Sequence, residues 1–395
     1  MISKITESVN WVGKIDWQIK SFHGNELSTH NGTSFNSYLI TDEKNVLIDS
    51  VWLPFTSEFL KNISSIIEFK KIDYIIVNHS EPDHTGALPH LIAKLPDVPI
   101  YCTANGSKAL KGHYHKDWNF KIVKNGDRLN IGSNELVFIE APMLHWPDTM
   151  MCFLTGENIL FSNDIFGQHY ASEYLYDDDN DNCQLYYEAM KYYANIISPF
   201  SKKAYKKISE LKELNLPIKL ICPAHGIIWK NNPKKIIDLY GQWSDSYSEN
   251  QITIIYDTMY NSTRKMAEEI CNGIKSVDNQ VKIKLFNASN TDKNDLVTEV
   301  FKSKGLIFGS PTLNGGVLSS IASLLEEIKG LNLTNKKAGA FGSYGWSATS
   351  IKYISDKLTE CGFELVGSGV KSQWNPTEEI IAECFSYGQE FAKAK

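Results

Sequence analysis

The sequence predicts a two-domain α/β protein in which a sheet-rich layered unit precedes a doubly wound parallel sheet. Its 395 residues are too many for one ordinary domain of roughly 150 residues. Short β-rich runs separated by turns fill residues 33–228, whereas strands alternate with amphipathic helices after residue 250. Residues 244–250 form a polar stretch suited to a linker, so the expected domains are residues 1–247 and 251–395.

Composition and charge exclude several functional classes. Apolar residues make up 42% of the chain and charged residues 22%, as in a folded globular protein. A formal net charge of -6 provides no general attraction to nucleic acid or to an anionic membrane. No run reaches the roughly 20 apolar residues of a membrane span, and the first residues lack the apolar core of a signal peptide. The seven cysteines are scattered and never spaced as C-x-x-C, which predicts reduced thiols in a cytoplasmic protein.

In the first half, six β-rich runs are expected to be strands, at residues 35–50, 72–80, 98–104, 134–142, 157–164 and 218–226. Helical segments are expected at residues 56–69, 86–95 and 233–247. In the second half, strands are expected at residues 251–258, 281–289, 304–312, 336–345 and 363–369. They alternate with helices at 264–275, 318–329 and 348–361, so the ligand site is expected where loops leave the carboxyl ends of the strands.

The most informative motif is His79-Ser80-Glu81-Pro82-Asp83-His84, which follows the apolar strand that begins at Ile72. The two-residue period of a strand places His79 and Glu81 on one face, and Asp83 and His84 can converge on them from the first turn after Pro82. Three further candidates stand at predicted strand ends: His145, Asp164 and His225, with 18 and 60 residues between them.

Seven candidate ligands are too many for a single metal ion. Four imidazoles and three carboxylates suit a dinuclear site in which one carboxylate bridges the metals, and Asp164 is the natural bridge. The absence of thiolates favours iron or manganese, and zinc remains an alternative.

This motif resembles the H-x-H-x-D-H pattern of the metallo-β-lactamase fold, with Glu81 in place of the middle histidine. Together with the spacing of the downstream ligands, that replacement resembles the flavodiiron proteins, also called A-type flavoproteins. The resemblance implies an N-terminal metallo-β-lactamase-like αββα domain followed by a flavodoxin-like domain. It also implies two irons. One is held by His79, Glu81 and His145, the other by Asp83, His84 and His225, and Asp164 lies between them.

Three further side chains resemble residues that surround the irons in this family. The resemblance implies that His23, His169 and Tyr193 donate hydrogen bonds or protons to a bound oxygen species. Reduction to water needs such a proton supply.

A cofactor site is predicted where the strand that starts at residue 251 runs into a helix near Arg264. Hydroxyls and backbone N–H groups at a helix N-terminus bind an anion without net positive charge. The connecting loop lacks the lysine of a nucleoside triphosphate loop, and its spacing resembles the flavodoxin loop that binds the FMN phosphate. Its residues are Thr258, Met259, Tyr260, Asn261, Ser262 and Thr263.

Two more loops leave predicted strands on the same edge of the sheet. Their glycines allow backbone to approach a flat ring, and Tyr344 or Trp346 can lie against it. The candidate flavin contacts in these loops are Pro311, Thr312, Leu313, Asn314, Gly315, Ser343, Tyr344, Gly345 and Trp346. No G-x-G-x-x-G turn is present, which disfavours NAD.

Together, FMN and a diiron pair hold four electrons, the number that reduces O2 to water; the same pair can reduce NO to N2O. The sequence therefore predicts an oxidoreductase and does not rank the two gases. The resemblance implies a head-to-tail homodimer or a dimer of dimers and a donor such as rubredoxin, expected to be a separate protein because no such module follows Lys395. Three alternatives stay open: a metal-dependent hydrolase fused to a flavodoxin, a direct F420H2 oxidase, and an electron carrier whose metal site is vestigial.

Overall fold

The computed structural model describes residues 2–394 and divides into two compact units. Unit 1 runs to residue 193 and resumes over residues 200–241, and unit 2 comprises residues 194–199 and the chain from residue 242 onward. Placing the short segment 194–199 with unit 2 differs from the predicted division at residue 247. The expected linker is also shorter than predicted, because the first strand of unit 2 already begins at Glu249.

Unit 1 contains two large sheets. The seven-stranded sheet has the order β1 (Ser3–Lys4), β2 (Val9–Trp11), β7 (Tyr38–Ile40), β8 (Asn45–Ile48), β9 (Ile72–Ile76), β10 (Ile100–Cys102) and β11 (Phe120–Ile122). The five-stranded sheet has the order β12 (Arg128–Asn130), β13 (Glu135–Glu140), β14 (Met150–Leu154), β15 (Ile159–Asn163) and β16 (Leu220–Pro223). Two small hairpins add β3 (Lys14–Asp16) with β6 (Thr33–Phe35) and β4 (Ser21–Phe22) with β5 (Leu27–Ser28).

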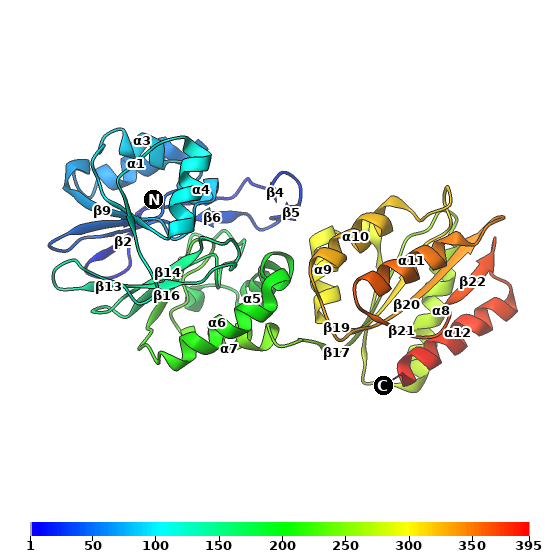
Figure 1. Ribbon diagram of the computed structural model, residues 1–395. Coiled ribbons are helices and arrows are strands. Elements are labelled where there is room, and N and C mark those ends of the chain that lie inside the picture. The colour runs from blue at the N-terminus through cyan, green and yellow to red at the C-terminus, as the bar shows by residue number, and fades with distance from the viewer. Residues whose placement is uncertain (1, 395) are drawn as a thin grey trace. The chain divides into compact units, whose positions relative to one another are not determined.

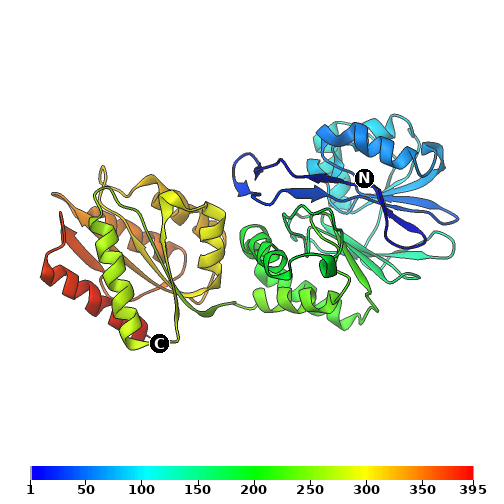
Figure 2. The ribbon, with the colours of Figure 1, turned by 180° about the vertical axis from the view of Figure 1, so that it is seen from behind.

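The two sheets pack face to face, and helices cover their outer faces (Figures 1 and 2). One buried cluster joins both sheets, with Tyr38 and Ile76 from the first and Phe138 and Phe161 from the second. Because both faces of each sheet are covered, β14 and β15 are buried along their whole length, and β14 is entirely apolar. The helices of unit 1 are α1 (Thr56–Ser64), α2 (Pro82–Thr85), α3 (Leu88–Ile92), α4 (Ala104–Tyr114), α5 (Asn182–Tyr192), α6 (Ser201–Glu213) and α7 (Pro233–Trp243).

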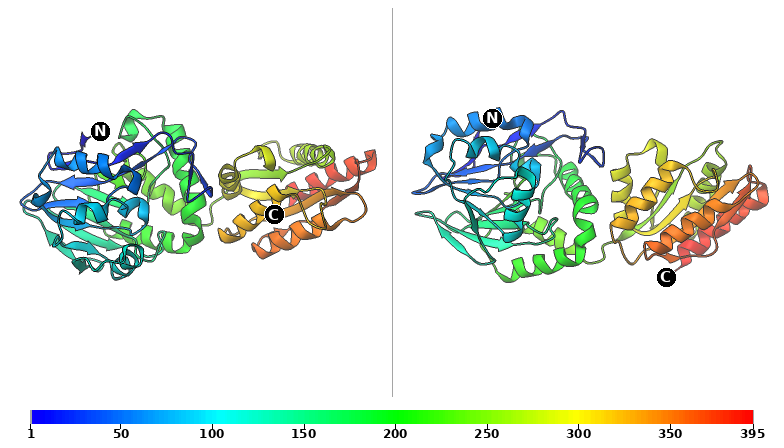
Figure 3. Two further views of the ribbon diagram at one scale, coloured as in Figure 1. Left: turned by 90° about the horizontal axis from the view of Figure 1, so that it is seen from above. Right: turned by 45° about the horizontal axis from the view of Figure 1, so that its top comes forward.

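Unit 2 is a parallel sheet with strand order β18 (Lys282–Asn287), β17 (Glu249–Tyr256), β19 (Ser303–Gly309), β20 (Lys337–Tyr344) and β21 (Glu364–Leu365), and β22 (Val370–Gln373) also pairs with β20. Its helices are α8 (Ser262–Val277), α9 (Lys293–Lys302), α10 (Ser319–Gly330), α11 (Thr349–Glu360) and α12 (Glu378–Lys393). The helices α8 and α12 cover one face, and α10 and α11 cover the other (Figure 3). The strand order reverses next to β17, where such sheets bind ligands.

The structure corrects several predicted boundaries. The helix predicted over residues 56–69 ends at Ser64, and a short 3-10 turn at Phe69–Lys71 leads into β9. The helix predicted from Arg264 begins at Ser262, because Asn261 before it adopts a left-handed backbone conformation that starts the turn. Among residues 2–394, every helix is too short or too polar to span a lipid bilayer.

Candidate metal centre and flavin site

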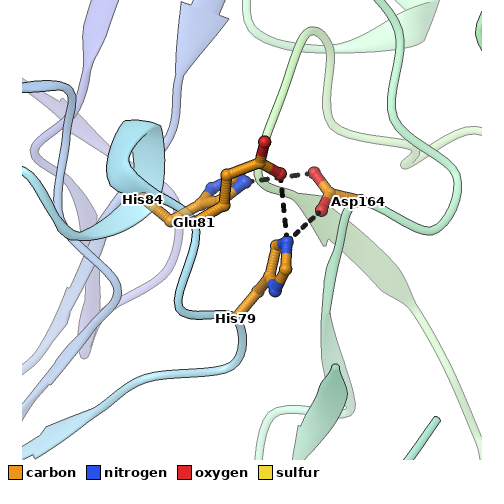
Figure 4. A group of neighbouring side chains, drawn as sticks. All are labelled: His79, Glu81, His84 and Asp164. Atoms are coloured by element: carbon orange, nitrogen blue, oxygen red, sulfur yellow. Dashed lines mark hydrogen bonds and ion pairs between the residues drawn. The ribbon is translucent and has the colours of Figure 1, made fainter. Parts of the chain in front are cut away.

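The structure brings the seven candidate metal ligands of unit 1 together. They lie on loops that leave the carboxyl ends of β9, β13, β15 and β16. After β9 the loop of residues 77–81 carries His79 and Glu81 and leads to Pro82, which begins the one-turn helix α2. This helix directs Asp83 and His84 back towards His79. The backbone carbonyl of His84 is anchored by the N–H and hydroxyl of Ser50. Figure 4 shows His79, Glu81, His84 and Asp164 pointing towards one another.

Asp164 lies at the centre of the cluster. Its Oδ2 atom is 3.7 Å from His79 Nε2 and 3.5 Å from His145 Nε2. Its Oδ1 atom is 3.3 Å from His84 Nε2 and 3.6 Å from His225 Nε2. The two carboxylate oxygens therefore face different pairs of imidazoles.

Each histidine pair has a carboxylate of its own. Glu81 Oε2 lies 3.2 Å from His79 Nε2 and 3.3 Å from His145 Nε2. Asp83 Oδ2 lies 3.3 Å from His84 Nε2 and 3.0 Å from His225 Nε2. The cluster thus consists of two sets of two imidazoles and one carboxylate, joined by Asp164.

The donor set fits a pair of divalent metal ions. All four imidazoles present Nε2 to the carboxylates, so the nitrogen atoms converge. Asp164 Oδ2 and Asp83 Oδ1 are buried and accept no hydrogen bond from the described residues, and such orphaned oxygens are costly unless a cation satisfies them. Nitrogen and oxygen ligands without a thiolate suit iron, manganese or zinc.

Mutual charge neutralisation stabilises the cluster. Burial alone would lower the pKa of His79, but hydrogen bonds to Asp148 and Glu81 raise it to about 10. Burial would likewise lower the pKa of His84 and His145, and the nearby carboxylates raise these values to about 9 and 10. Burial would raise the pKa of Asp164, yet the charge of His84 and hydrogen bonding hold it well below its usual range. Metal ions binding here would displace protons from the imidazoles.

Two contacts missed by sequence reasoning orient the imidazoles. Asp148 Oδ2 is 3.1 Å from His79 Nδ1, and the backbone carbonyl of Ser34 is 2.7 Å from His225 Nδ1. Such acceptors hold the proton on Nδ1 and leave Nε2 free for a metal. Asp148 follows His145 by three residues, and that proximity was the one available signal in the sequence.

Two of the three predicted surrounding side chains lie at the cluster. His23 Nε2 is 2.8 Å from Glu81 Oε1, and its side chain is 38% exposed. His169 is buried with its ring 5.4 Å from that of His225 and its Nδ1 atom 3.0 Å from the Thr33 hydroxyl. Burial and the charge of His225 hold the pKa of His169 well below its usual range, so its imidazole is neutral.

Tyr193, the third predicted side chain, does not face the cluster. Its hydroxyl lies 3.0 Å from the Ser201 hydroxyl and its ring packs edge-on against Tyr240. The preceding residue, Tyr192, donates its hydroxyl to Asp164 Oδ1 at 3.0 Å. Neighbouring residues of a helix point about 100° apart, so only one of the two tyrosines can face the site.

In unit 2, the predicted cofactor loops surround a cavity of about 370 Å³. The predicted residues lining it are Thr258, Met259, Tyr260, Ser262, Pro311, Thr312, Leu313, Asn314, Gly315, Ser343, Tyr344, Gly345 and Trp346. Ser347 and Trp374 line it as well and were not predicted, although Trp374 directly follows β22 at the same edge of the sheet.

The remaining two predicted cofactor residues lie outside the lining. Asn261 precedes helix α8 with φ of +66°, and the buried Thr263 hydroxyl lies 3.2 Å from that of Ser343. Both therefore shape the loop. The Thr258 hydroxyl in this loop is buried and has no hydrogen-bond partner among the described residues, as expected where a polar ligand completes the site. The N-terminus of α8 lies in this loop, as the predicted anion site requires.

Comparisons with known proteins agree with this architecture. Residues 33–226 match the model of the ODP family beta lactamase, and residues 254–388 match flavodoxin. The chain is 47% identical over 391 residues to an anaerobic nitric oxide reductase flavorubredoxin of Escherichia coli. The aligned region covers 98% of this chain and 81% of that relative.

Solved structures agree as well. Rubredoxin oxygen:oxidoreductase from Desulfovibrio gigas superimposes with a TM-score of 0.96 at 36% identity, over 100% of this chain and 98% of that one. The flavodiiron protein of Giardia intestinalis superimposes with a TM-score of 0.94 at 32% identity, over 100% of this chain and 96% of that one. These matches confirm the predicted succession of a metallo-β-lactamase-like and a flavodoxin-like domain. The chain therefore belongs to the flavodiiron protein family.

Proposed function

We propose that this protein is an oxidoreductase that takes electrons from a donor protein and passes them through FMN to a diiron centre, where O2 is reduced to water, NO to N2O, or both. The observation that carries this proposal is the position of Asp164, whose two oxygens face two complete ligand sets. A flavin cavity on the same chain has no use in a hydrolase.

The metal-binding residues divide into two groups. His79, Glu81 and His145 would hold one iron and Asp83, His84 and His225 the other, with Asp164 between them. When bound, FMN accepts electrons singly or in pairs and the iron pair stores two more, which supplies the four electrons that O2 reduction requires. We assign the metal-binding domain to residues 1–247 and the FMN domain to residues 251–395.

Two side chains are suited to supply protons. The half-exposed His23 contacts both solvent and Glu81, and hydrogen bonding to Glu81 raises its pKa, so it can carry a proton to the site. The neutral His169 has a buried Nε2 atom that finds no hydrogen-bond partner within residues 2–394, and this atom can bond to a small ligand. Reduction to water consumes protons, and a buried site must receive them through such groups.

Anaerobic purification followed by iron and flavin analysis tests the proposal. We expect about two irons and one FMN per chain, and rapid reoxidation of the reduced protein when O2 or NO is added in stopped-flow experiments. Failure of both gases to reoxidise the protein would contradict the proposal. A zinc-containing, flavin-free preparation with esterase activity would establish the hydrolase alternative, and metal-free protein with intact FMN would establish the electron-carrier alternative.

We further propose that a rubredoxin-type protein donates the electrons, as the name of the Desulfovibrio gigas relative indicates for that protein. The chain offers exposed aromatic side chains at the flavin cavity, where Trp346 is 96% and Tyr260 84% exposed. Reduction assays with rubredoxin and with F420H2 separate this donor from the direct F420H2 oxidase alternative.

The exposed aromatic side chains also support a head-to-tail homodimer or a dimer of dimers, in which a second copy covers the flavin. Sedimentation of the purified protein as a monomer that retains full activity would refute this assembly.

We place the protein in the cytoplasm because its seven cysteines, all within the described residues, form no disulfide. Fractionation of the producing cells tests that location.

A further inference from the structure

We infer that Asp148 is a positioning residue that makes the metal position formed by His79, Glu81 and His145 the tighter of the two. The inference rests on the proposed diiron centre. It concerns the residues that contact the metal ligands without binding metal themselves, and these residues differ between the two ligand sets.

The Asp148 carboxylate is held in place from two sides. It is only 3% exposed, and its Oδ2 atom accepts the backbone N–H of Ser80 at 2.7 Å. The backbone carbonyl of Asp148 in turn accepts the Thr103 hydroxyl at 3.0 Å. The same Oδ2 atom lies 3.1 Å from His79 Nδ1. A fixed carboxylate therefore contacts this imidazole at Nδ1, while Nε2 faces the metal cluster.

This contact has two consequences for His79. The proton stays on Nδ1, so a metal that displaces the proton of Nε2 meets the lone pair of that atom on the side of Glu81 and Asp164. A carboxylate acceptor also makes the imidazole a stronger electron donor to a metal than a neutral acceptor would. The ring of Trp146 packs edge-on at 5.0 Å and limits rotation of the imidazole.

The other set has weaker support. His225 Nδ1 contacts a neutral backbone carbonyl, that of Ser34, at 2.7 Å. Asp164 Oδ1, which faces His84 and His225, also accepts the Tyr192 hydroxyl, and this bond competes with a metal for the oxygen. Each set also has a donor on one carboxylate oxygen, because His23 contacts Glu81 Oε1 just as Tyr192 contacts Asp164 Oδ1. The difference that remains is that the imidazole of the first position has a charged acceptor at Nδ1 and that of the second has a neutral one.

Binding of ferrous iron to metal-free full-length protein, under anaerobic conditions and against a competing chelator, tests this inference. The wild type is expected to bind two irons with unequal affinities. Asp148→Asn keeps the shape and one acceptor oxygen but removes the charge, and we expect it to weaken the tighter step by about 10- to 100-fold. The weaker step should be unchanged.

A matched control removes another buried carboxylate of unit 1. Asp177 is 2% exposed and accepts the backbone N–H groups of Lys230 and Asn231. Asp177→Asn should alter thermal stability without changing either iron-binding step. An Asp148→Asn variant that binds both irons like the wild type would overturn the inference.

A second measurement does not depend on any variant folding. Crystals of metal-free wild type are loaded with one equivalent of ferrous iron, and the occupancy of each position is measured by anomalous scattering. We expect the iron beside His79 and His145; equal occupancy, or preference for the position beside His225, would overturn the inference. Protein that binds fewer than two irons at saturation would instead contradict the proposed diiron function.

Discussion

At the scale of single residues, the two oxygens of Asp164 divide the metal site into two halves. One oxygen faces His79 and His145, and the other faces His84 and His225. A single carboxylate can hold this position only if its own orientation is fixed. Tyr192 supplies that restraint on one side, because its hydroxyl donates to Asp164 Oδ1 at 3.0 Å.

Replacing the two neighbouring tyrosines separately tests this role. Tyr192→Phe removes the hydrogen bond to Asp164, and we expect both irons to remain bound while the rate of gas reduction falls by about 10-fold or more. Tyr193→Phe removes the contact with Ser201 and leaves Asp164 untouched, so we expect a cost of about 1 kcal/mol in stability without loss of activity. Stopped-flow reoxidation and iron analysis measure both effects. A larger loss of activity in Tyr193→Phe than in Tyr192→Phe would contradict the assignment.

At the scale of elements, two glycines allow α8 and α12 to pack closely. A Cβ atom at Gly273 of α8 would lie 2.0 Å from the carbonyl oxygen of Phe385, and one at Gly388 of α12 would lie 2.2 Å from that of Ile270. Backbone atoms cannot move aside as a flexible side chain can. The helix that begins at the flavin loop is therefore held against α12 by backbone contacts that leave no room for a side chain.

Gly273→Ala is expected to destabilise unit 2 by about 1–3 kcal/mol, because the added methyl group forces the two helices apart. FMN should be lost at a lower temperature than in the wild type, while iron content is unchanged. Flavin fluorescence during thermal unfolding measures this. Gly330→Ala is the control, since no atom lies within 4 Å of its Cβ position, and it should be neutral or slightly stabilising. If Gly273→Ala and Gly330→Ala released FMN at the same temperature, the packing argument would be refuted.

At the scale of the whole molecule, protons and metals compete for one buried cluster. The pKa values of His79, His84 and His145 are raised to about 10, 9 and 10, above the ordinary histidine value of about 6.5. A histidine with a raised pKa in the folded state stabilises the fold fully below its unfolded pKa. That contribution is lost as the pH rises through the folded pKa.

The metal-free protein should therefore lose stability as the pH rises from about 6.5 to about 10, because over this range the unfolded chain binds fewer protons than the folded cluster. The iron-loaded protein should not lose stability in this window, because its ligand histidines carry no proton on Nε2. Thermal unfolding of both forms across this range, followed by tryptophan fluorescence, measures the difference. If the stability of the metal-free and the iron-loaded protein fell equally over this pH range, groups other than these histidines would control the pH dependence.

Much of the fold and candidate site could be predicted because the relevant signals are local. Strand runs end at turn residues, and His79, His145, Asp164 and His225 each stand at or just beyond such an end. In the αββα sandwich these ends converge, so residues far apart in the sequence meet. The flavin loops follow the same rule in unit 2, where they line the cavity.

The sequence by itself determined the order of the domains and the types of side chain available for metals and flavin. These follow from strand and helix periodicity, which is a property of neighbouring residues. Only the tertiary structure decided that Tyr192 rather than Tyr193 reaches Asp164, that Trp374 lines the flavin cavity, and that Asp148 supports His79 across 69 residues of chain. Such contacts depend on helix rotation and on the packing of distant loops, and no local pattern encodes either.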